Sequence, residues 1–215
     1  MKRSLLAGAA LLAAVILPAA VNAQETIKIG VITAFSGQFA DTSAQIDNGI
    51  KLYMKQHGDK VAGKKIEIIR KDTGGPNPDV SKRLAQELVV RAKADILAGV
   101  ALTPEALGAA SVADEAKKFM VVMNAATAVI TEKSPYIVRV SLTLPMIGET
   151  LGTWAVKKGG VKKAYTMVTD YGPGLDAEAA FQRAFKAAGG EIVGSVRMPI
   201  ANPDFSAFVQ RAKDL

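Results

Sequence analysis

The sequence predicts an α/β protein, in which the strands of a parallel sheet alternate with helices that cover both faces. Three observations support this class. Short apolar segments recur along the chain, longer amphipathic segments separate them, and glycine or proline marks many of the boundaries. Strands joined through helices of about ten to fifteen residues form right-handed crossovers, and these crossovers build parallel sheets.

The first residues have the pattern of an export signal. Two basic residues precede an apolar run at 5–17, and Val21 and Ala23 place short side chains before a cleavage point. The run is shorter than the about 20 residues that a membrane-spanning helix needs. We therefore expect 1–23 to be a cleaved signal peptide and the remaining chain to be exported to the periplasm. The sequence contains no cysteine, which excludes a lipid anchor at the cleavage site.

The elements of the first half follow from local patterns. Residues 26–32 alternate apolar and polar side chains and then become fully apolar, as a strand does when it enters a covered sheet. Pro78 suits the first position of a helix and Asn77 can cap it. The other predicted elements, in chain order, are a helix at 43–56, a strand at 65–71, a helix at 78–92, a strand at 95–99, a helix at 104–118, and strands at 119–123 and 136–140.

After residue 141 the same alternation starts again. The predicted elements are a helix at 144–158, a strand at 163–169, a helix at 175–188, a strand at 191–198 and a helix over 204–215. Paired glycines stop the first two of these helices, as glycines at helix C-termini commonly do. We therefore expect two lobes, an N-terminal ligand-binding lobe at 24–141 and a second lobe at 142–215. The chain stops within an amphipathic helix, so we expect this second lobe to be truncated.

Composition excludes several classes of function. The net charge of +7 falls to +5, or 25 basic against 20 acidic residues, without the predicted signal, and the basic residues are scattered in ones and twos. Nucleic-acid binding needs a continuous basic stripe. Because the basic residues are scattered, we do not expect the protein to bind nucleic acid. With no cysteine and one histidine, His57 at the end of a predicted surface helix, no metal site or other cofactor site is expected.

The leading enzyme alternative is a Rossmann-like dehydrogenase, because it shares the α/β alternation. Such an enzyme needs closely spaced glycines after the first strand so that the backbone can approach a pyrophosphate. Only Gly37 stands in that loop. We therefore expect the protein not to be an enzyme.

A ligand site is expected at the carboxyl ends of the strands, where loops run into helix N-termini. Helix N-termini expose unpaired N–H groups and a partial positive charge, so they can hold a carboxylate without metal or arginine. Three loops fit this description: 34–38, 102–104 and 124–127. Thr103 can cap its helix and also face a ligand.

Five segments together resemble the branched-chain amino-acid (Leu/Ile/Val) type of periplasmic binding protein. They are 27–31 through Ser36-Gly37, Asp72 with Asn77-Pro78, Gly99 through Thr103, Asn124 through Thr127, and Tyr171-Gly172-Pro173-Gly174. The resemblance implies a type I fold of two lobes with doubly wound parallel sheets, and a ligand held between the lobes. It also implies a monomer that captures a small carboxylate, a hydrophobic amino acid or an aromatic acid, for an ABC permease in the inner membrane. A ligand-sensing receptor module of the same fold is the alternative.

The resemblance also assigns the site. Thr103, Ala125 and Thr127 take positions that contact the solute's carboxylate and amine. Ser36 in the loop 34–38 and Ala126 in the loop 124–127 are further candidate site residues, and Tyr171 closes over the ligand from the second lobe. The sequence departs from the family at two places, which bear on ligand identity. Gln38 replaces a common proline, and Pro104-Glu105 stands where hydroxyl residues are frequent.

Overall fold

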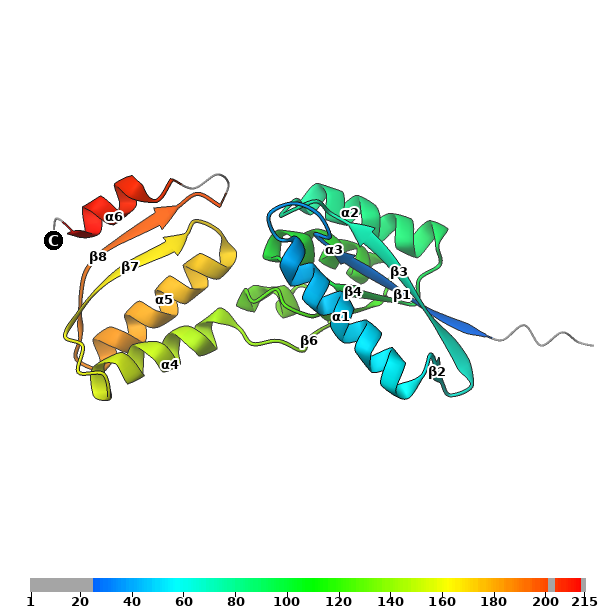
Figure 1. Cartoon of the computed structure of the whole chain (residues 1–215), viewed down its shortest axis with the longest axis horizontal. Coiled ribbons are helices and arrows are strands. Elements are labelled where there is room, and N and C mark those ends of the chain that lie inside the picture. The colour runs from blue at the N-terminus through cyan, green and yellow to red at the C-terminus, as the bar shows by residue number, and fades with distance from the viewer. Residues whose placement is uncertain (1–24, 201–203, 214–215) are drawn as a thin grey trace, which may run out of the picture.

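The computed structural model of the chain describes residues 25–200 and 204–213. The predicted signal peptide, 1–23, lies outside the described residues, as do the last two residues of the final predicted helix. The described chain forms two α/β units, each with its own sheet, joined by the segment between strand β6 and helix α4 (Figure 1). The α/β class predicted from the sequence is confirmed.

The first unit is built on a six-stranded sheet in the order β2-β3-β1-β4-β5-β6. Its strands are β1 (Thr26–Thr33), β2 (Lys60–Val61), β3 (Lys64–Asp72), β4 (Ile96–Gly99), β5 (Phe119–Val122) and β6 (Ile137–Arg139). All neighbouring pairs are parallel except the short β2–β3 hairpin at the edge. The carboxyl ends of the central strands therefore lie along one edge of the sheet, from which the following loops emerge.

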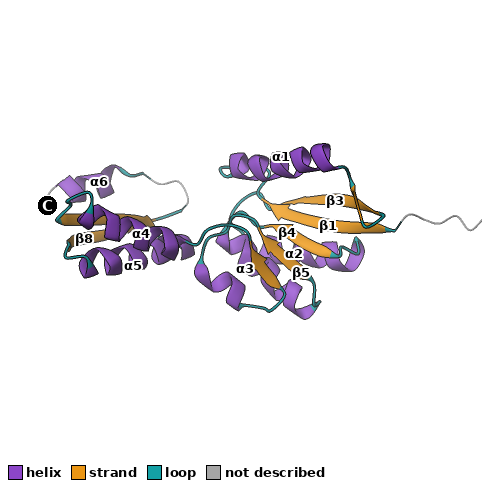
Figure 2. Ribbon diagram, turned by 90° about the horizontal axis from the view of Figure 1, so that it is seen from below, coloured by secondary structure: helices purple, strands orange, loops and turns teal. Residues whose placement is uncertain are grey.

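Helices cover both faces of this sheet, as expected for crossover connections. They are α1 (Ala40–His57), α2 (Pro78–Gln86), which continues into the π-helical turn η1 (Glu87–Arg91), and α3 (Thr103–Glu115). Figure 2 shows α1 on one face and α2 with α3 on the other. The core lies under α2 and α3, where Leu88, Leu97 and Met120 are almost fully buried among the alanines of α3.

The second unit holds a two-stranded parallel sheet and three helices. Its elements are α4 (Leu144–Lys157), β7 (Lys163–Thr169), α5 (Gly172–Ala187), β8 (Glu191–Met198) and α6 (Ser206–Lys213). Helices α4 and α5 pack closely because Gly148 and Gly152 have no side chain at their contact. A Cβ atom on Gly152 would lie 2.7 Å from the carbonyl oxygen of Phe181.

Several local predictions are confirmed and others are wrong in an informative way. The Asn77 side chain accepts hydrogen bonds from the N–H groups of Asp79 and Val80, both at 3.1 Å, so it caps α2 as predicted. Helix α5 begins at Gly172, three residues earlier than predicted. Pro173 does not delay the helix, because proline is tolerated in the first helical turn, where its missing N–H group has no helical partner.

Candidate functional site

The candidate site is a cleft of about 420 Å³ to which both units contribute. From the first unit come the loops that follow β4 and β5, and from the second come the starts of α4 and α5. The lining residues are Ala101, Leu102, Thr103, Asn124, Ala125, Ala126, Ser141, Leu142, Leu144, Ile147, Tyr171 and Pro173. The volume lies within the range typical of small-molecule sites. The cleft thus unites segments that are up to about 70 positions apart in the chain, a juxtaposition that follows from the parallel topology.

Two threonines join the loops of the first unit at this cleft. The Oγ1 atoms of Thr103 and Thr127 share a hydrogen bond of 2.7 Å, and the two residues are only 3% and 5% exposed. Asn124 adds a second link, because its Nδ2 donates to the carbonyl oxygen of Ala101 at 2.9 Å. These bonds hold the loop after β4 and the loop after β5 in one fixed arrangement.

The expected capping role of Thr103 is wrong. Helix α3 begins at Thr103 itself, with Leu102 as its N-cap residue, and the Thr103 hydroxyl bonds to Thr127 instead of to its own helix. The N–H group of Leu102 is satisfied by Oε2 of Glu105 at 2.9 Å, as in the reciprocal half of a capping box. The Thr103 side chain therefore does not cap α3, and Thr103 is one of the residues that line the cleft.

Glu105 is the organising residue that the sequence did not single out as part of the site. Its carboxylate is fully buried and accepts hydrogen bonds from the Thr73 hydroxyl at 2.5 Å and from the Leu102 N–H group. Burial raises the pKa of the Glu105 carboxyl, and the hydrogen bonds from Thr73 and from nearby backbone N–H groups oppose that rise. The available signal was a glutamate three positions after the N-cap of a predicted helix.

Ser36 lies apart from the threonine pair. Its side chain is exposed, and it is not among the residues that line the cleft. The N–H groups of Phe35 and Ser36 donate to Oδ1 of Asp72 at 2.8 and 3.2 Å, and Gly74 donates to the same atom at 2.8 Å. Burial on its own raises the pKa of the Asp72 carboxyl, but the hydrogen bonds from Ser36, Gly74 and Phe35 outweigh it and lower the pKa. Ser36 thus belongs to the loop between β1 and α1, which Asp72 at the end of β3 holds through backbone hydrogen bonds.

Ala125 and Ala126 line the cleft, but part of their backbone is already engaged. The Ala125 N–H group donates to the carbonyl oxygen of Val100 at 3.2 Å. The Ala126 carbonyl accepts from the N–H group of Leu144 at 3.0 Å, which ties the loop after β5 to the start of α4. These two bonds fix the loop's shape.

Tyr171 faces the cleft from the second unit. It precedes α5 as the N-cap residue and is half-buried, and burial raises the pKa of its phenol. The phenol therefore remains protonated at neutral pH and keeps its hydrogen-bond donor. The adjacent Gly172 meets the threonine pair directly, because a Cβ atom there would lie 2.8 Å from Oγ1 of Thr127 and 3.2 Å from Cγ2 of Thr103.

Sequence reasoning missed the apolar wall of the cleft. Leu142 and Ile147 are 60% and 44% exposed, and with Leu144 they line the side that the second unit contributes. Their pattern is that of a helix packed on a core, so periodicity alone could not identify them as site residues. None of the lining residues in the described part is charged. The cleft is therefore apolar with a few hydroxyl and amide groups.

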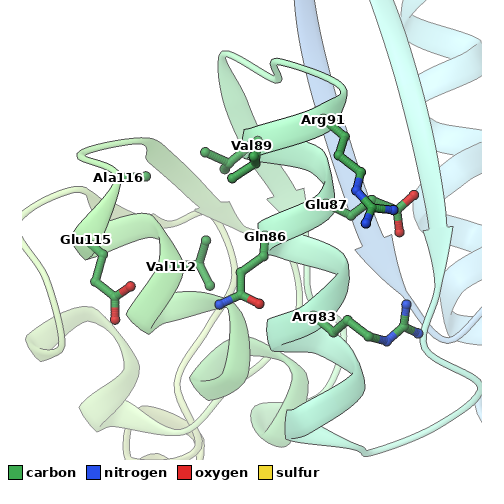
Figure 3. Close-up of a pocket in the computed structure, with 9 residues that line it drawn as sticks. Arg83, Gln86, Glu87, Val89, Arg91, Val112, Glu115 and Ala116 are labelled. Atoms are coloured by element: carbon green, nitrogen blue, oxygen red, sulfur yellow. The ribbon is translucent and has the colours of Figure 1, made fainter.

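A second hollow, of about 600 Å³, lies on the outside of the first unit. Figure 3 shows that α2 with η1 and α3 alone supply its lining, which includes Arg83, Arg91 and Glu115. It contains none of the residues predicted from the sequence and lies between two surface helices. The cleft between the units is the stronger candidate, because loops from the carboxyl ends of parallel strands converge there.

The described residues hold no group of three or more histidine, cysteine, aspartate or glutamate side chains that could bind a metal ion. Among the helices of the described part, none combines the length and the apolar character that a membrane span needs. His57 is exposed at the end of α1, as predicted, where its ring lies 4.3 Å from that of Tyr53.

Comparison with known proteins supplies the context of this site. A sequence model of the family described as "Periplasmic binding protein" matches residues 26–215. The chain is 46% identical over 190 residues to the "Leu/Ile/Val-binding protein homolog 6" of Brucella abortus (strain 2308), a match that covers 88% of this chain and 48% of the relative. The chain therefore spans about half the length of the curated relatives it matches.

Two solved structures are similar over the same region. One is a solute binding protein of an ABC transporter from Rhodopseudomonas palustris BisB5 in complex with 3,4-dihydroxy benzoic acid, at 53% identity and a TM-score of 0.85, covering 88% of this chain and 52% of that one. The other is a solute binding protein from R. palustris in complex with 4-hydroxybenzoate, at 47% identity and a TM-score of 0.86, covering 88% and 51%.

Proposed function

The chain belongs to the periplasmic binding protein family, and from this we propose that it is part of a periplasmic solute-binding component of an ABC importer that holds a small carboxylate between two lobes. The single observation that carries the proposal is the uncharged cleft between the two units, with the Thr103–Thr127 pair on one side and Tyr171 on the other. In this proposal the units correspond to lobes at 24–141 and 142–215, the first following a cleaved signal peptide at 1–23, and an inner-membrane permease is the partner.

The chemistry of the cleft suits a carboxylate. The start of α3 lies at its wall, and a helix N-terminus carries a partial positive charge that favours an anion. The hydroxyl groups of Thr103 and Thr127 stand beside it, and one of the pair has a hydrogen to spare for a ligand oxygen, because only one of the two donates within the pair. No metal or cofactor is needed for such binding.

The ligand class we favour is an aromatic carboxylate of the hydroxybenzoate type. Two solved relatives at 53% and 47% identity hold 3,4-dihydroxy benzoic acid and 4-hydroxybenzoate. In the cleft, Leu142, Leu144 and Ile147 offer an apolar wall against which a flat ring can pack. Tyr171, which lines the cleft from the second unit, supplies a phenol as a further polar group for the ring hydroxyl that such ligands carry.

A branched-chain amino acid is the second candidate. It is favoured by the name of the curated relatives, the Leu/Ile/Val-binding protein homologs at 46% identity. The same α3 terminus would hold its carboxylate and the same apolar wall its side chain. The two candidates differ at the amine, for which none of the described lining residues supplies a negative charge.

Binding between two lobes implies a mechanism. A ligand that contacts Thr103 and Tyr171 together gains those contacts only when the lobes are closed, so its binding favours closure. In a transporter, the closed form is what the permease recognises. A sensing module of the same fold would bind its ligand in the same way and differ only in the partner that reads the closed form.

The proposal is tested by isothermal titration calorimetry with 4-hydroxybenzoate, 3,4-dihydroxybenzoate, benzoate and leucine. We expect a hydroxybenzoate to bind most tightly, with Kd in the micromolar range, roughly −8 kcal/mol. Thr103→Val should weaken binding about tenfold, because a hydrogen bond to a charged oxygen is lost. Thr42→Val on α1, far along the chain from the cleft lining, is the matched control and should change nothing. No heat with any of the four compounds would refute the proposal.

A further inference from the structure

One hydrogen bond joins the two units without taking part in the cleft. Oδ2 of Asp176, near the start of α5, accepts from the N–H group of Ala128 at 2.7 Å. Ala128 is the first residue of the short 3-10 helix η2 (Ala128–Glu132), so its N–H group has no partner within that helix. Neither residue lines the cleft.

A cation accompanies this bond. Arg139, at the end of β6, donates through its guanidinium group to the carbonyl oxygen of Thr127, the residue next to Ala128. Burial lowers the pKa of Arg139, and the negative charge of Asp176 opposes that effect. The Nε atom of Arg139 is buried and has no hydrogen-bond partner among the described residues.

The backbone geometry allows the two units to approach this closely at one place. Gly172, one turn before Asp176 on the same helix, packs against Thr127 with no room for a Cβ atom, 2.8 Å from Oγ1. The contact therefore runs along a short seam in which α5 lies against the loop after β5. Within this seam, Asp176 is the acidic side chain that crosses from one unit to the other.

We propose that Asp176 is a clasp, which stabilises the closed arrangement of the two lobes by accepting the hydrogen bond of the Ala128 N–H group. The inference rests on the proposed function in assuming that the lobes open and close. It assigns to Asp176 an effect on ligand affinity without contact with the ligand, because the apparent affinity falls in proportion to the fraction of molecules that can close.

The test uses two substitutions that remove the same hydrogen bond from opposite sides. Asp176→Ala removes the acceptor. Ala128→Pro removes the donor, at the first position of η2, which follows an extended residue at Thr127 and where proline is tolerated. Asp114→Ala is the matched control, because Asp114 is exposed on α3 and is absent from the cleft lining. Circular dichroism checks that each variant is folded.

Two measurements are made on each variant. The first is the affinity for 4-hydroxybenzoate by calorimetry. The second is the distance between spin labels at Lys82→Cys on α2 and Ala179→Cys on α5, both exposed positions, in a chain that has no other cysteine. We expect each clasp variant to bind about tenfold more weakly and to shift the ligand-free distances to longer values. The double variant should show no larger effect than either single one, as substitutions that break one shared interaction do.

The outcomes separate the clasp from the proposed function. Unchanged affinity and unchanged distances in Asp176→Ala, or effects that add fully in the double variant, would overturn the clasp while the binding function stands. If the unsubstituted protein binds no carboxylate, the proposed function fails, and the label distances still decide on the clasp. A change of distances in Asp176→Ala with none in Asp114→Ala supports the clasp in either case.

Discussion

The hydroxyl pair of Thr103 and Thr127 shows how the neighbours of a residue determine its role. A threonine before a proline at a helix start is normally a capping residue. Here Leu102 is the N-cap residue and its N–H group donates to Glu105, while the Thr103 hydroxyl shares a hydrogen bond with Thr127 in the loop after β5.

Glu105 should be needed as a carboxylate. Both of its oxygens accept hydrogen bonds, Oε1 from Thr73 and Oε2 from Leu102, so an amide would place an N–H group against a donor. We expect Glu105→Gln to lower the free energy of unfolding by about 1–3 kcal/mol, the cost of an unsatisfied buried polar group. Chemical denaturation measures it. Glu115→Gln, exposed on the same helix, should stay within about 0.5 kcal/mol of the unsubstituted protein, and an equal loss in both variants would contradict the role of burial.

At the scale of single residues, the sequence pointed to six candidate site residues, and five of them line the cleft or bond to a residue that lines it. Thr103, Ala125, Ala126 and Tyr171 line it, and Thr127 bonds to Thr103. Ser36 does not, because the loop after β1 turns toward Asp72. Nothing in the local sequence states which way that loop turns, since the partner carboxylate comes from a strand 36 positions later.

At the scale of elements, the sequence predicted nearly every helix and strand of the described chain, with ends displaced by a few residues. The hairpin strand β2 was missed, since it is only two residues long and carries no periodic pattern. The π-helical turn η1 was predicted as plain helix, because the apolar spacing of α2 continues through it. The 3-10 helix η2 was not predicted either, and all three features depend on hydrogen-bond geometry more than on side-chain pattern.

The contact between α2 and α3 provides a prediction about packing. Gly108 lies where these helices cross, and a Cβ atom there would come within 2.1 Å of the carbonyl oxygen of Pro78. We expect Gly108→Ala to force the helices apart and to destabilise the fold by about 1–3 kcal/mol. Thermal unfolding of the variant measures this.

The control for this prediction is the same substitution in another helix. Gly49 lies in α1, and a Cβ atom there would have no other atom within 4 Å, so Gly49→Ala should stabilise the protein by up to about 1 kcal/mol through helix propensity. Opposite signs at the two glycines are the expected result. Stabilisation at both would show that α2 and α3 do not need the close approach.

At the scale of the whole molecule, the sequence predicted two α/β units with a ligand between them, but not the residues through which the units contact each other. Local periodicity reports which face of a helix is apolar, and it does not report which second unit that face contacts. The seam at Gly172 and Asp176 therefore became evident only from the structure. The exposed apolar residues Leu142 and Ile147 gain a functional interpretation in the same way, as one wall of a cleft between the units.

The most direct test of the account is a crystal structure of the protein grown with 4-hydroxybenzoate. We predict density for the ligand between the two units, with its carboxylate at the start of α3 within hydrogen-bond distance of Thr103 or Thr127, and Tyr171 on the opposite side of the ring. Density for the ligand only on the outer surface, such as the hollow between α2 and α3, with the cleft occupied by water alone, would contradict the account.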